Sequence, residues 1–168
     1  MKISMIAAMD EQRGIGFQGK IPWHIKQDLL RFRDLTLGKT VIFGRKTYES
    51  LLGYYQRSGR PMPDRRTIVI SRQVQNNNSS EKNVFYVSSL EEAIKLSEKI
   101  EPREVFISGG GQIFNQGIKY AEKLYLTVVK GNFQADAFFP EYGEFNKKVF
   151  EEDHKEGNIK FKFVELVK

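Results

Sequence analysis

Up to about residue 129, the chain alternates continuous apolar runs with segments in which apolar residues recur every three or four positions. Continuous runs are typical of strands buried on both faces, and the longer period is typical of helices. Strands separated by helices form βαβ units, so the pattern predicts an α/β fold with a mostly parallel central sheet. The expected strands cover residues 2–9, 40–43, 66–71, 83–87, 104–108 and 123–129.

The expected helices lie between these strands. They run from after residue 23 to about residue 38, over residues 45–52, over residues 89–100, and within residues 109–120. Gly53 is expected to end the second helix, because glycine is a poor helix former. Ser89 and Glu92 have the spacing of a capping box at the start of the third. The polar stretch 75–80 is expected to be a mobile loop.

The C-terminal part of the chain reads differently. Residues 147–156 and 159–167 are predicted to form a hairpin closed around Gly157 and Asn158. This hairpin would lie antiparallel at one edge of the sheet. The sequence contains no internal repeat and no linker, so a single domain over residues 1–168 is expected.

Composition excludes several kinds of chemistry. The chain has no cysteine, which excludes disulfides, thiolate catalysis and sulfur-ligated metals. His24 and His154 are too few and too far apart for a histidine-built metal centre. The N-terminal apolar run is short and is followed at once by Asp10 and Glu11, so it indicates a strand rather than a signal peptide. No run is long enough to span a membrane, and a cytoplasmic location is expected.

The net charge of +6 is compatible with an anionic partner or with a solubilising surface. Three expected strands are followed by residues suited to binding an anion or a nucleotide. These residues are Gly44-Arg45-Lys46-Thr47, Ser71-Arg72 and Gly109-Gly110-Gly111. The carboxyl ends of parallel strands share one edge of a sheet, where ligands bind. Phe114 stands where the dinucleotide-binding glycine pattern needs a glycine, so the glycines alone are also compatible with a tight turn.

Asp28 is the least expected residue in an otherwise regular helix. Ile25, Leu29 and Phe32 form one apolar face, and Asp28 falls on that same face. A carboxylate on a buried face is destabilising unless something pairs with it. The partner could be the backbone, an arginine such as Arg31, or solvent. It could also be a nitrogen heterocycle, because one carboxylate can accept two parallel N–H bonds.

Taken together, these segments resemble dihydrofolate reductase. The resemblance is carried by "MIAAMDEQRGIGFQGKIPWHIKQDLLRF", "VIFGRKTYESL", "RPMPDRRTIVIS", "VFISGGGQIF", "LYLTVV" and "ADAFFP", which run in order from residue 5 to residue 140. The resemblance implies a mostly parallel eight-stranded sheet with an antiparallel C-terminal edge, flanked by about four helices. It also implies reduction of 7,8-dihydrofolate to tetrahydrofolate by NADPH.

The resemblance assigns roles to individual residues. Asp28 would hydrogen-bond the 2-amino group and N3 of the pterin with help from Thr127, while hydride reaches C6 and a solvent proton reaches N5. Residues 10–24 would form a loop that closes over the nicotinamide, with Trp23 at its base. Arg65 would pair with the glutamate α-carboxylate. The expected catalytic residues are Asp28, Trp23 and Thr127, and the expected substrate-binding residues are Ile6, Ala7, Asp28, Leu29, Phe32, Leu51, Arg60, Arg65 and Thr127.

The resemblance also implies a cofactor site at the carboxyl edge of the sheet. The Gly109–Gly110 peptide bond would be cis. Arg45, Lys46, Thr47 and Arg72 would hold the cofactor phosphates. The expected cofactor-binding residues are Ala8, Ile15, Gly16, Gly44, Arg45, Lys46, Thr47, Ser71, Arg72, Gly109, Gly110, Gly111, Gln112, Ile113 and Phe114.

The sequence departs from the common pattern of the family at Ser108, Gln112 and Phe114, and residues 53–59 look like an insertion. The expected partners are dihydrofolate and antifolate inhibitors, with no nucleic acid and no membrane, and a monomer is expected. Two alternatives remain. One is a related NADPH-dependent reductase of riboflavin synthesis. The other is a basic nucleic-acid-binding module that uses the aromatic and basic residues 53–60.

Overall fold

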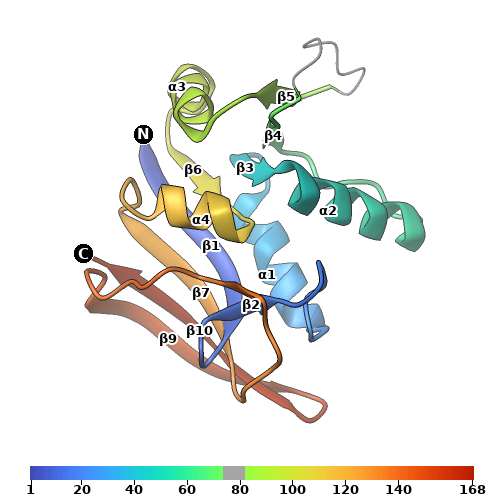
Figure 1. Cartoon of the computed structure of the whole chain (residues 1–168), viewed down its shortest axis with the longest axis vertical. Coiled ribbons are helices and arrows are strands. Elements are labelled where there is room, and N and C mark those ends of the chain that lie inside the picture. Colours follow the sequence, from blue (N-terminus) through green and yellow to red (C-terminus); the bar gives the residue numbers. More distant parts are fainter. Residues whose placement is uncertain (74–81) are drawn as a thin grey trace.

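The structure, a computed structural model, describes residues 1–73 and 82–168 (Figure 1). Its helices are α1 (Lys26–Thr36), α2 (Arg45–Ser58), α3 (Leu90–Ile100) and α4 (Gly111–Gly117). Its strands are β1 (Lys2–Asp10), β2 (Gly14–Gly16), β3 (Thr40–Gly44), β4 (Arg66–Ile70), β5 (Val84–Val87), β6 (Glu104–Ile107), β7 (Lys123–Val129), β8 (Ala137–Phe138), β9 (Lys147–Glu156) and β10 (Ile159–Val167). The polar loop expected at residues 75–80 lies outside the described residues.

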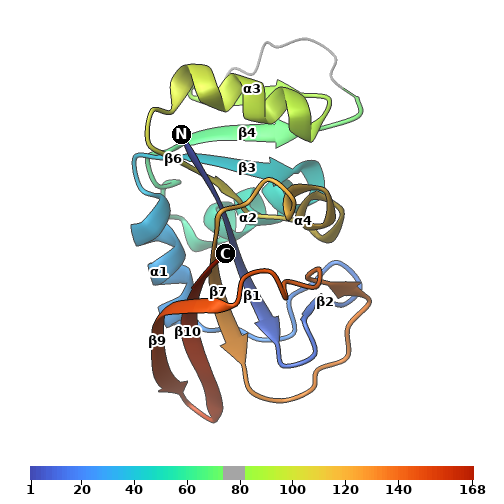
Figure 2. The ribbon, with the colours of Figure 1, turned by 90° about the vertical axis from the view of Figure 1, so that its left-hand side faces the viewer.

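Eight of these strands form one sheet in the order β5-β4-β3-β6-β1-β7-β10-β9. The six strands from β5 to β7 pair in parallel, and β10 pairs antiparallel with both β7 and β9. This confirms the mostly parallel sheet with an antiparallel C-terminal hairpin at one edge. Figure 2 shows how strongly the sheet twists between β3 and β4 on one side and β1 and β7 on the other.

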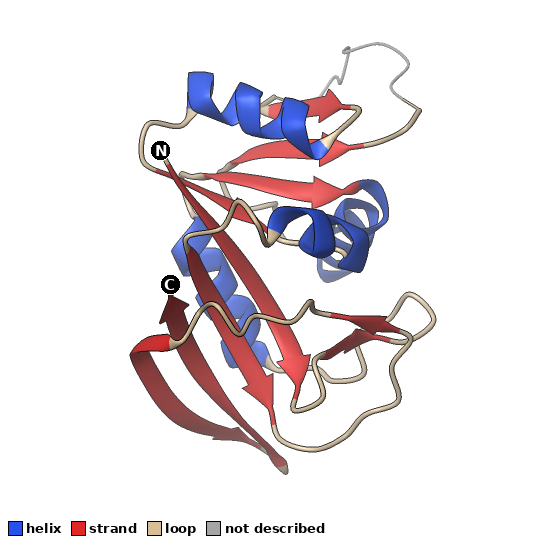
Figure 3. Ribbon diagram, turned by 60° about the vertical axis from the view of Figure 1, so that its left-hand side comes forward, coloured by secondary structure: helices blue, strands red, loops and turns tan. Residues whose placement is uncertain are grey.

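The helices cover both faces of the sheet, with α1 and α2 on one face and α3 and α4 on the other (Figure 3). Because side chains alternate along a strand, β1 contributes to both cores. Met5 and Met9 pack on the side of α3 and α4, whereas Ile6 packs on the side of α1 and α2. A third cluster joins Trp23 and Ile25, which precede α1, to aromatic residues of β10.

Helix α2 runs through Gly53 to Ser58, so the prediction that Gly53 ends it is wrong. Tyr48, Leu51 and Leu52 pack in the core on this side of the sheet, and that packing outweighs the helix-propensity penalty of one glycine, about 1 kcal/mol. The helix ends instead at Gly59, whose φ of 68° is the left-handed conformation common after a helix. Residues 53–58, expected to belong to an insertion, are the last turns of α2.

Helix α3 begins at the predicted cap. The Ser89 hydroxyl accepts a hydrogen bond from the Glu92 N–H at 3.1 Å. The Glu92 carboxylate accepts from the N–H and the hydroxyl of Ser88, both at 2.9 Å, rather than from the Ser89 N–H. Only the first half of the expected capping box is therefore formed.

Glu101 is a buried acid that the sequence did not single out. Its carboxylate accepts hydrogen bonds from Arg66 at 2.6 Å, from the Arg103 N–H at 3.1 Å and from the Thr40 hydroxyl at 3.3 Å. Removal from water raises the pKa of Glu101, but these hydrogen bonds and the charge of Arg66 outweigh that effect and hold its pKa below 4.5. Glu101 therefore joins β3, β4 and the end of α3 at the amino edge of the sheet.

We expect Glu101→Gln to lower the free energy of unfolding at pH 7 by about 1.5–3 kcal/mol, the usual range for hydrogen bonds to a charged group. A carboxyl whose folded-state pKa is lowered stabilises the protein above its unfolded value of 4.5, and this stabilisation is lost as the pH falls below that value. Urea unfolding at pH 7 and pH 4 checks this. The difference between wild type and variant should shrink at pH 4, and Glu98→Gln, an exposed site on α3, serves as the control. A difference that is constant with pH would contradict the ionised network.

Candidate active site

The Asp28 side chain points from α1 toward β7. The Thr127 hydroxyl donates a hydrogen bond to Asp28 Oδ1 at 2.5 Å. Arg31 does not pair with Asp28, because its guanidinium donates to Glu165 Oε1 at 2.7 Å and lies over the Phe163 ring. Within the described part of the chain, no cation lies within ion-pair distance of the Asp28 carboxylate. Removal from water raises the pKa of Asp28 above 3.8, and the Thr127 hydrogen bond and the Arg31 charge offset only part of that rise.

Apolar side chains from α1, α2 and β1 lie on the same side of the sheet as Asp28. Ile6, Phe32 and Leu51 belong to one cluster, and Leu29 is half-buried one position after Asp28. Four of the expected wall residues therefore share this side of the sheet. Ala7 differs, because its side chain packs in the cluster on the α3 and α4 side, and only its main chain could meet a ligand beside Asp28.

Arg65 is buried and carries three unsatisfied nitrogens. The residue is 6% exposed, and its Nε, Nη1 and Nη2 atoms have no hydrogen-bond partner among the described residues. Its guanidinium lies 5.0 Å from the centre of the Phe32 ring. Removal from water lowers the pKa of Arg65, and the nearby Tyr55 opposes part of that shift. A buried cation without an acceptor is suited to an incoming carboxylate. Arg60, also expected at this site, is exposed just beyond the end of α2.

The carboxyl ends of β3 and β6 meet at the glycines. The Gly44 N–H donates to the Gly109 carbonyl at 2.7 Å, and the Gly109–Gly110 peptide bond is cis as the resemblance implied. Small residues let the chain pack closely at this edge. A Cβ atom added at Gly44 would lie 3.3 Å from Ile113 Cγ1, and one added at Gly110 would lie 3.2 Å from Thr47 Oγ1. The main chain can therefore approach Ile113 and Thr47 more closely here than larger side chains would allow.

The remaining expected cofactor residues surround these glycines or lie at the ends of the neighbouring strands. A Cβ atom added at Gly111 would lie 3.8 Å from Ile15 Cδ1. Phe114 is buried against Gly109 and packs on Phe139 with ring centres 5.0 Å apart. The other side chains divide by exposure: Ser71 is buried, Ala8, Gly16 and Thr47 are half-buried, and Arg45, Lys46, Arg72 and Gln112 are exposed.

The exposed cations Arg45, Lys46 and Arg72 follow two neighbouring parallel strands. Gly44 at the end of β3 is in register with Ile70 at the end of β4. The residues that come next in each strand therefore lie at the same edge. Three positive charges beside these glycines form a suitable place for the phosphates of a nucleotide.

The loop of residues 10–24 is fixed by a residue that sequence reasoning missed. The buried Asp10 carboxylate accepts hydrogen bonds from the N–H groups of Gln12 and Gly14, both at 2.8 Å, and of Phe133 at 3.0 Å. Within the loop, β2 pairs with β8. An aspartate directly after a buried strand was the available signal, because its side chain commonly bonds the main chain two residues further on.

Trp23 anchors the other end of this loop. It is 9% exposed and packs edge-on against Phe133 with ring centres 5.2 Å apart. The loop thus runs from Asp10 to Trp23 with both ends attached to the segment after β7. Its middle, at Ile15, lies beside the glycines of α4.

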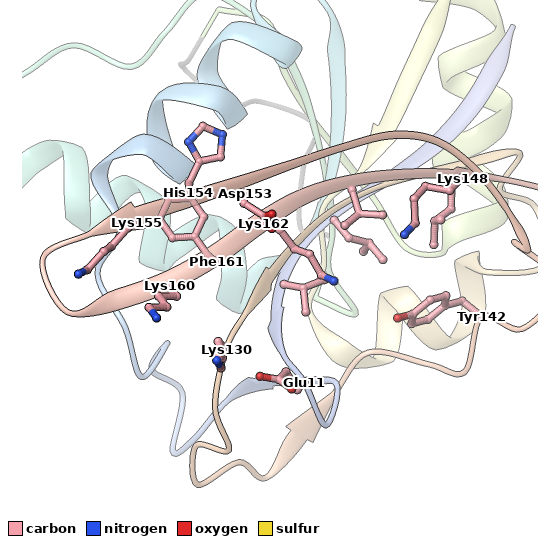
Figure 4. Close-up of a pocket in the computed structure, with 14 residues that line it drawn as sticks. Glu11, Lys130, Tyr142, Lys148, Asp153, His154, Lys155, Lys160, Phe161 and Lys162 are labelled. Carbon is pink, nitrogen blue, oxygen red and sulfur yellow. The ribbon is translucent and has the colours of Figure 1, made fainter.

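A cavity of about 920 Å³ opens elsewhere, on the C-terminal strands (Figure 4). Leu126, Val164 and Leu166 in its wall belong to the core cluster on the α3 and α4 side, so it lies across the sheet from Asp28. Its basic lining residues are Lys130, Lys148, Lys155, Lys160 and Lys162. No residue expected to bind substrate or cofactor lines it.

Two further observations limit what the described residues can do. No group of three or more carboxylate or imidazole side chains among residues 1–73 and 82–168 is placed to hold a metal ion. No helix in these same ranges combines the length and the apolar character needed to cross a membrane.

Known proteins resemble this chain along nearly its whole length. The family model described as dihydrofolate reductase matches residues 2–168. The dihydrofolate reductase of Bacillus subtilis (strain 168) is 37% identical over 147 residues, which is 88% of this chain and 80% of that protein. That of Staphylococcus aureus is 37% identical over 142 residues, covering 84% of this chain and 80% of that protein.

A solved structure agrees with these sequence matches. The dihydrofolate reductase from Enterococcus faecalis, in complex with NADP(H) and RAB-propyl, superposes with a TM-score of 0.80 at 30% sequence identity. The match covers 99% of this chain and 95% of that one. The chain therefore belongs to the dihydrofolate reductase family.

Proposed function

We propose that this chain reduces 7,8-dihydrofolate to 5,6,7,8-tetrahydrofolate with NADPH, and that Asp28 binds and orients the pterin. The single observation that carries the role of Asp28 is its carboxylate, which faces an apolar site with Thr127 as its only side-chain partner among the described residues. The 2-amino group and N3 of a pterin offer the two parallel N–H donors that this carboxylate lacks. In surroundings of low polarity, its negative charge also favours a protonated pterin.

The rest of the substrate fits the same side of the sheet. Ile6, Leu29, Phe32 and Leu51 provide apolar walls for the pterin and benzoyl groups. Arg65 offers its unsatisfied nitrogens to the glutamate α-carboxylate. The monomer expected from the family resemblance is part of this proposal.

The glycine edge, formed by Gly44, Gly109 and Gly110 at the carboxyl ends of β3 and β6, suits a dinucleotide that lies close to the main chain. NADPH, when bound, supplies the hydride that reduces C6. The half-buried glycines Gly44 and Gly110 would lie against the cofactor, and Arg45, Lys46, Thr47 and Arg72 would hold its phosphates. The loop from Asp10 to Trp23 would exclude water at Ile15, which strengthens electrostatic interactions inside the site. A solvent proton completes the reduction at N5.

Asp28→Asn tests the central assignment. The amide keeps the shape but loses the charge, so the rate of hydride transfer near neutral pH should fall about a hundredfold or more. Acid should partly restore the rate, because substrate protonated in solution then binds ready to react. The decrease in absorbance at 340 nm with NADPH and dihydrofolate, followed as a function of pH, measures both effects.

The matched control is Asp34→Asn, the same change at an exposed position of the same helix. The free energy of unfolding separates a catalytic role of Asp28 from a structural one. A carboxyl with a raised folded-state pKa destabilises the folded protein as the pH rises through that pKa. Asp28→Asn should therefore be at least as stable as wild type at pH 7. A variant that keeps the wild-type pH–rate profile contradicts the role of Asp28.

Arg65→Leu tests the glutamate site. Loss of a charge-assisted pair should weaken dihydrofolate about ten- to a hundredfold, and should leave a dihydropterin without the glutamate tail nearly unaffected. Dissociation constants for both ligands give the comparison. The exposed Arg33, which is not among the expected substrate-binding residues, provides the control in Arg33→Leu. Equal losses for the two ligands would rule out Arg65 as the carboxylate partner.

Arg45→Ala combined with Arg72→Ala tests cofactor choice. NADPH carries one phosphate more than NADH, so its affinity should fall about tenfold or more while that of NADH stays close to wild type. Added salt should weaken NADPH binding more in wild type than in the variant, because ionic contacts are screened. The control removes two other exposed arginines, Arg33 and Arg57, at the same change in net charge. An unchanged preference for NADPH would mean that these cations are only a solvated surface.

A further inference from the structure

Helix α1, which carries Asp28, begins without a cap of its own. The residue at its N-cap position is Ile25, whose side chain cannot accept a hydrogen bond. The first N–H groups of a helix have no partner within the helix, and serine, threonine, aspartate or asparagine at the cap usually accepts from them. The donors at the start of α1 therefore need an acceptor from elsewhere in the chain.

Glu156 supplies that acceptor from the C-terminal hairpin. One carboxylate oxygen accepts from the Lys26 N–H at 2.7 Å, and the other accepts from the Gln27 N–H at 3.1 Å. Glu156 is the last residue of β9, just before the turn at Gly157, whose φ is 61°. The bonds from the Lys26 and Gln27 N–H groups hold the pKa of Glu156 below its usual range, so the group is ionised at neutral pH. Its negative charge also suits the positive end of the helix dipole.

The position of Asp28 gives this cap a consequence for the reaction. Asp28 is the third residue of α1, so its carboxylate lies close to the free N–H groups of the first turn, which attract negative charge. The Asp28 carboxylate instead accepts from Thr127 on β7. Glu156 accepts from the N–H groups of Lys26 and Gln27, so these two donors of the first turn are not left to compete for the Asp28 carboxylate.

We propose that Glu156 is a positioning residue for the reaction, because it caps α1 from the hairpin and so keeps the Asp28 carboxylate directed at Thr127 and the pterin. This inference deepens the proposed function and rests on the role of Asp28 given above. Glu156 itself lies outside the pterin pocket and touches no reacting atom.

Other contacts hold the later turns of α1 and the glycines of the cofactor site. Loss of the cap is therefore expected to change mainly the position of the first turn of α1. Arg31, one turn further along, is held by Glu165 at 2.7 Å and by the Phe163 ring at 4.3 Å. The glycine edge belongs to β3, β6 and α4, and is joined by the hydrogen bond between Gly44 and Gly109. Loss of the Glu156 carboxylate should therefore change the chemistry at Asp28 and leave cofactor binding intact.

The first measurement compares kcat/KM for dihydrofolate with the dissociation constant for NADPH. Glu156→Ala should lower kcat/KM about tenfold, the scale of losing a helix cap, with the NADPH dissociation constant within about twofold of wild type. Glu156→Gln keeps an acceptor oxygen and should lose only about threefold. It keeps the test valid if the alanine variant does not fold. Glu151→Gln is the control, because Glu151 lies on the same strand and its partners are Lys148 and Lys162.

The second measurement repeats each Glu156 substitution in the Asp28→Asn protein. If Glu156 acts through Asp28, its loss should lower kcat/KM less than about twofold in that background, which is the non-additivity expected of coupled residues. Equal fractional losses in both backgrounds, parallel losses of NADPH affinity, or the same loss in Glu151→Gln would overturn the proposal. If Asp28→Asn alone leaves activity unchanged, the role of Asp28 fails. If Asp28→Asn is impaired and both Glu156 variants are not, only the role of Glu156 fails.

Discussion

The proposed chemistry depends on Asp28, a half-buried carboxylate on the apolar face of α1 with no cation within ion-pair distance among the described residues. Thr127 donates one hydrogen bond to Asp28, and the nearest candidate cation, Arg31, is committed to Glu165. Electrostatic interactions strengthen as the surroundings become less polar, so a bound ligand that brings N–H donors gains more here than it would in water. On this proposal, the ionised Asp28 carboxylate lowers the stability of the free protein and forms a strong interaction with the bound ligand. Active sites commonly trade stability for function in this way.

The C-terminal hairpin explains how such a group can be held in place. Phe161 and Phe163 of β10 pack with Ile25 ahead of α1, while Glu165 binds Arg31. Lys123 completes this group at 2.6 Å from Glu165, and the pKa of Lys123 is raised because its bonds to Glu165 and Tyr125 outweigh its removal from water. The antiparallel hairpin therefore holds the start of the Asp28 helix and its Arg31 side chain.

Local patterns in the sequence were sufficient for most of the fold. Continuous apolar runs predicted the parallel strands, and the residues after β3, β4 and β6 pointed to the edge that we propose binds the cofactor. The prediction that α2 ends at Gly53 was wrong because it used only the low helix propensity of glycine. The tertiary contacts of Leu51 and Leu52 stabilise the helix beyond that point. The short strands β2 and β8 have three and two residues, which is too few for any periodic pattern.

Contacts between distant parts of the chain could not be predicted from these patterns. The bonds from Glu156 to α1 span about 130 positions, and neither Ile25 nor Glu156 carries a local sign of them. The position of Asp10 after a strand could suggest its bonds to Gln12 and Gly14, but not its bond with the Phe133 N–H 123 positions away. Arg65 was assigned only through a family resemblance. Its burial and its unsatisfied nitrogens are properties of the folded chain that composition and spacing do not encode.

The most direct test of the central claim is the titration of Asp28 itself, followed by carbon-13 NMR of labelled aspartate side chains with Asp28→Asn used to assign the signal. The account predicts that Asp28 titrates above 3.8 in the free protein, because removal from water disfavours its charged form. A bound 2,4-diaminopteridine, which is readily protonated, should keep the carboxylate ionised and move this titration to lower pH. A signal that titrates at the ordinary value and does not respond to the ligand would contradict the account.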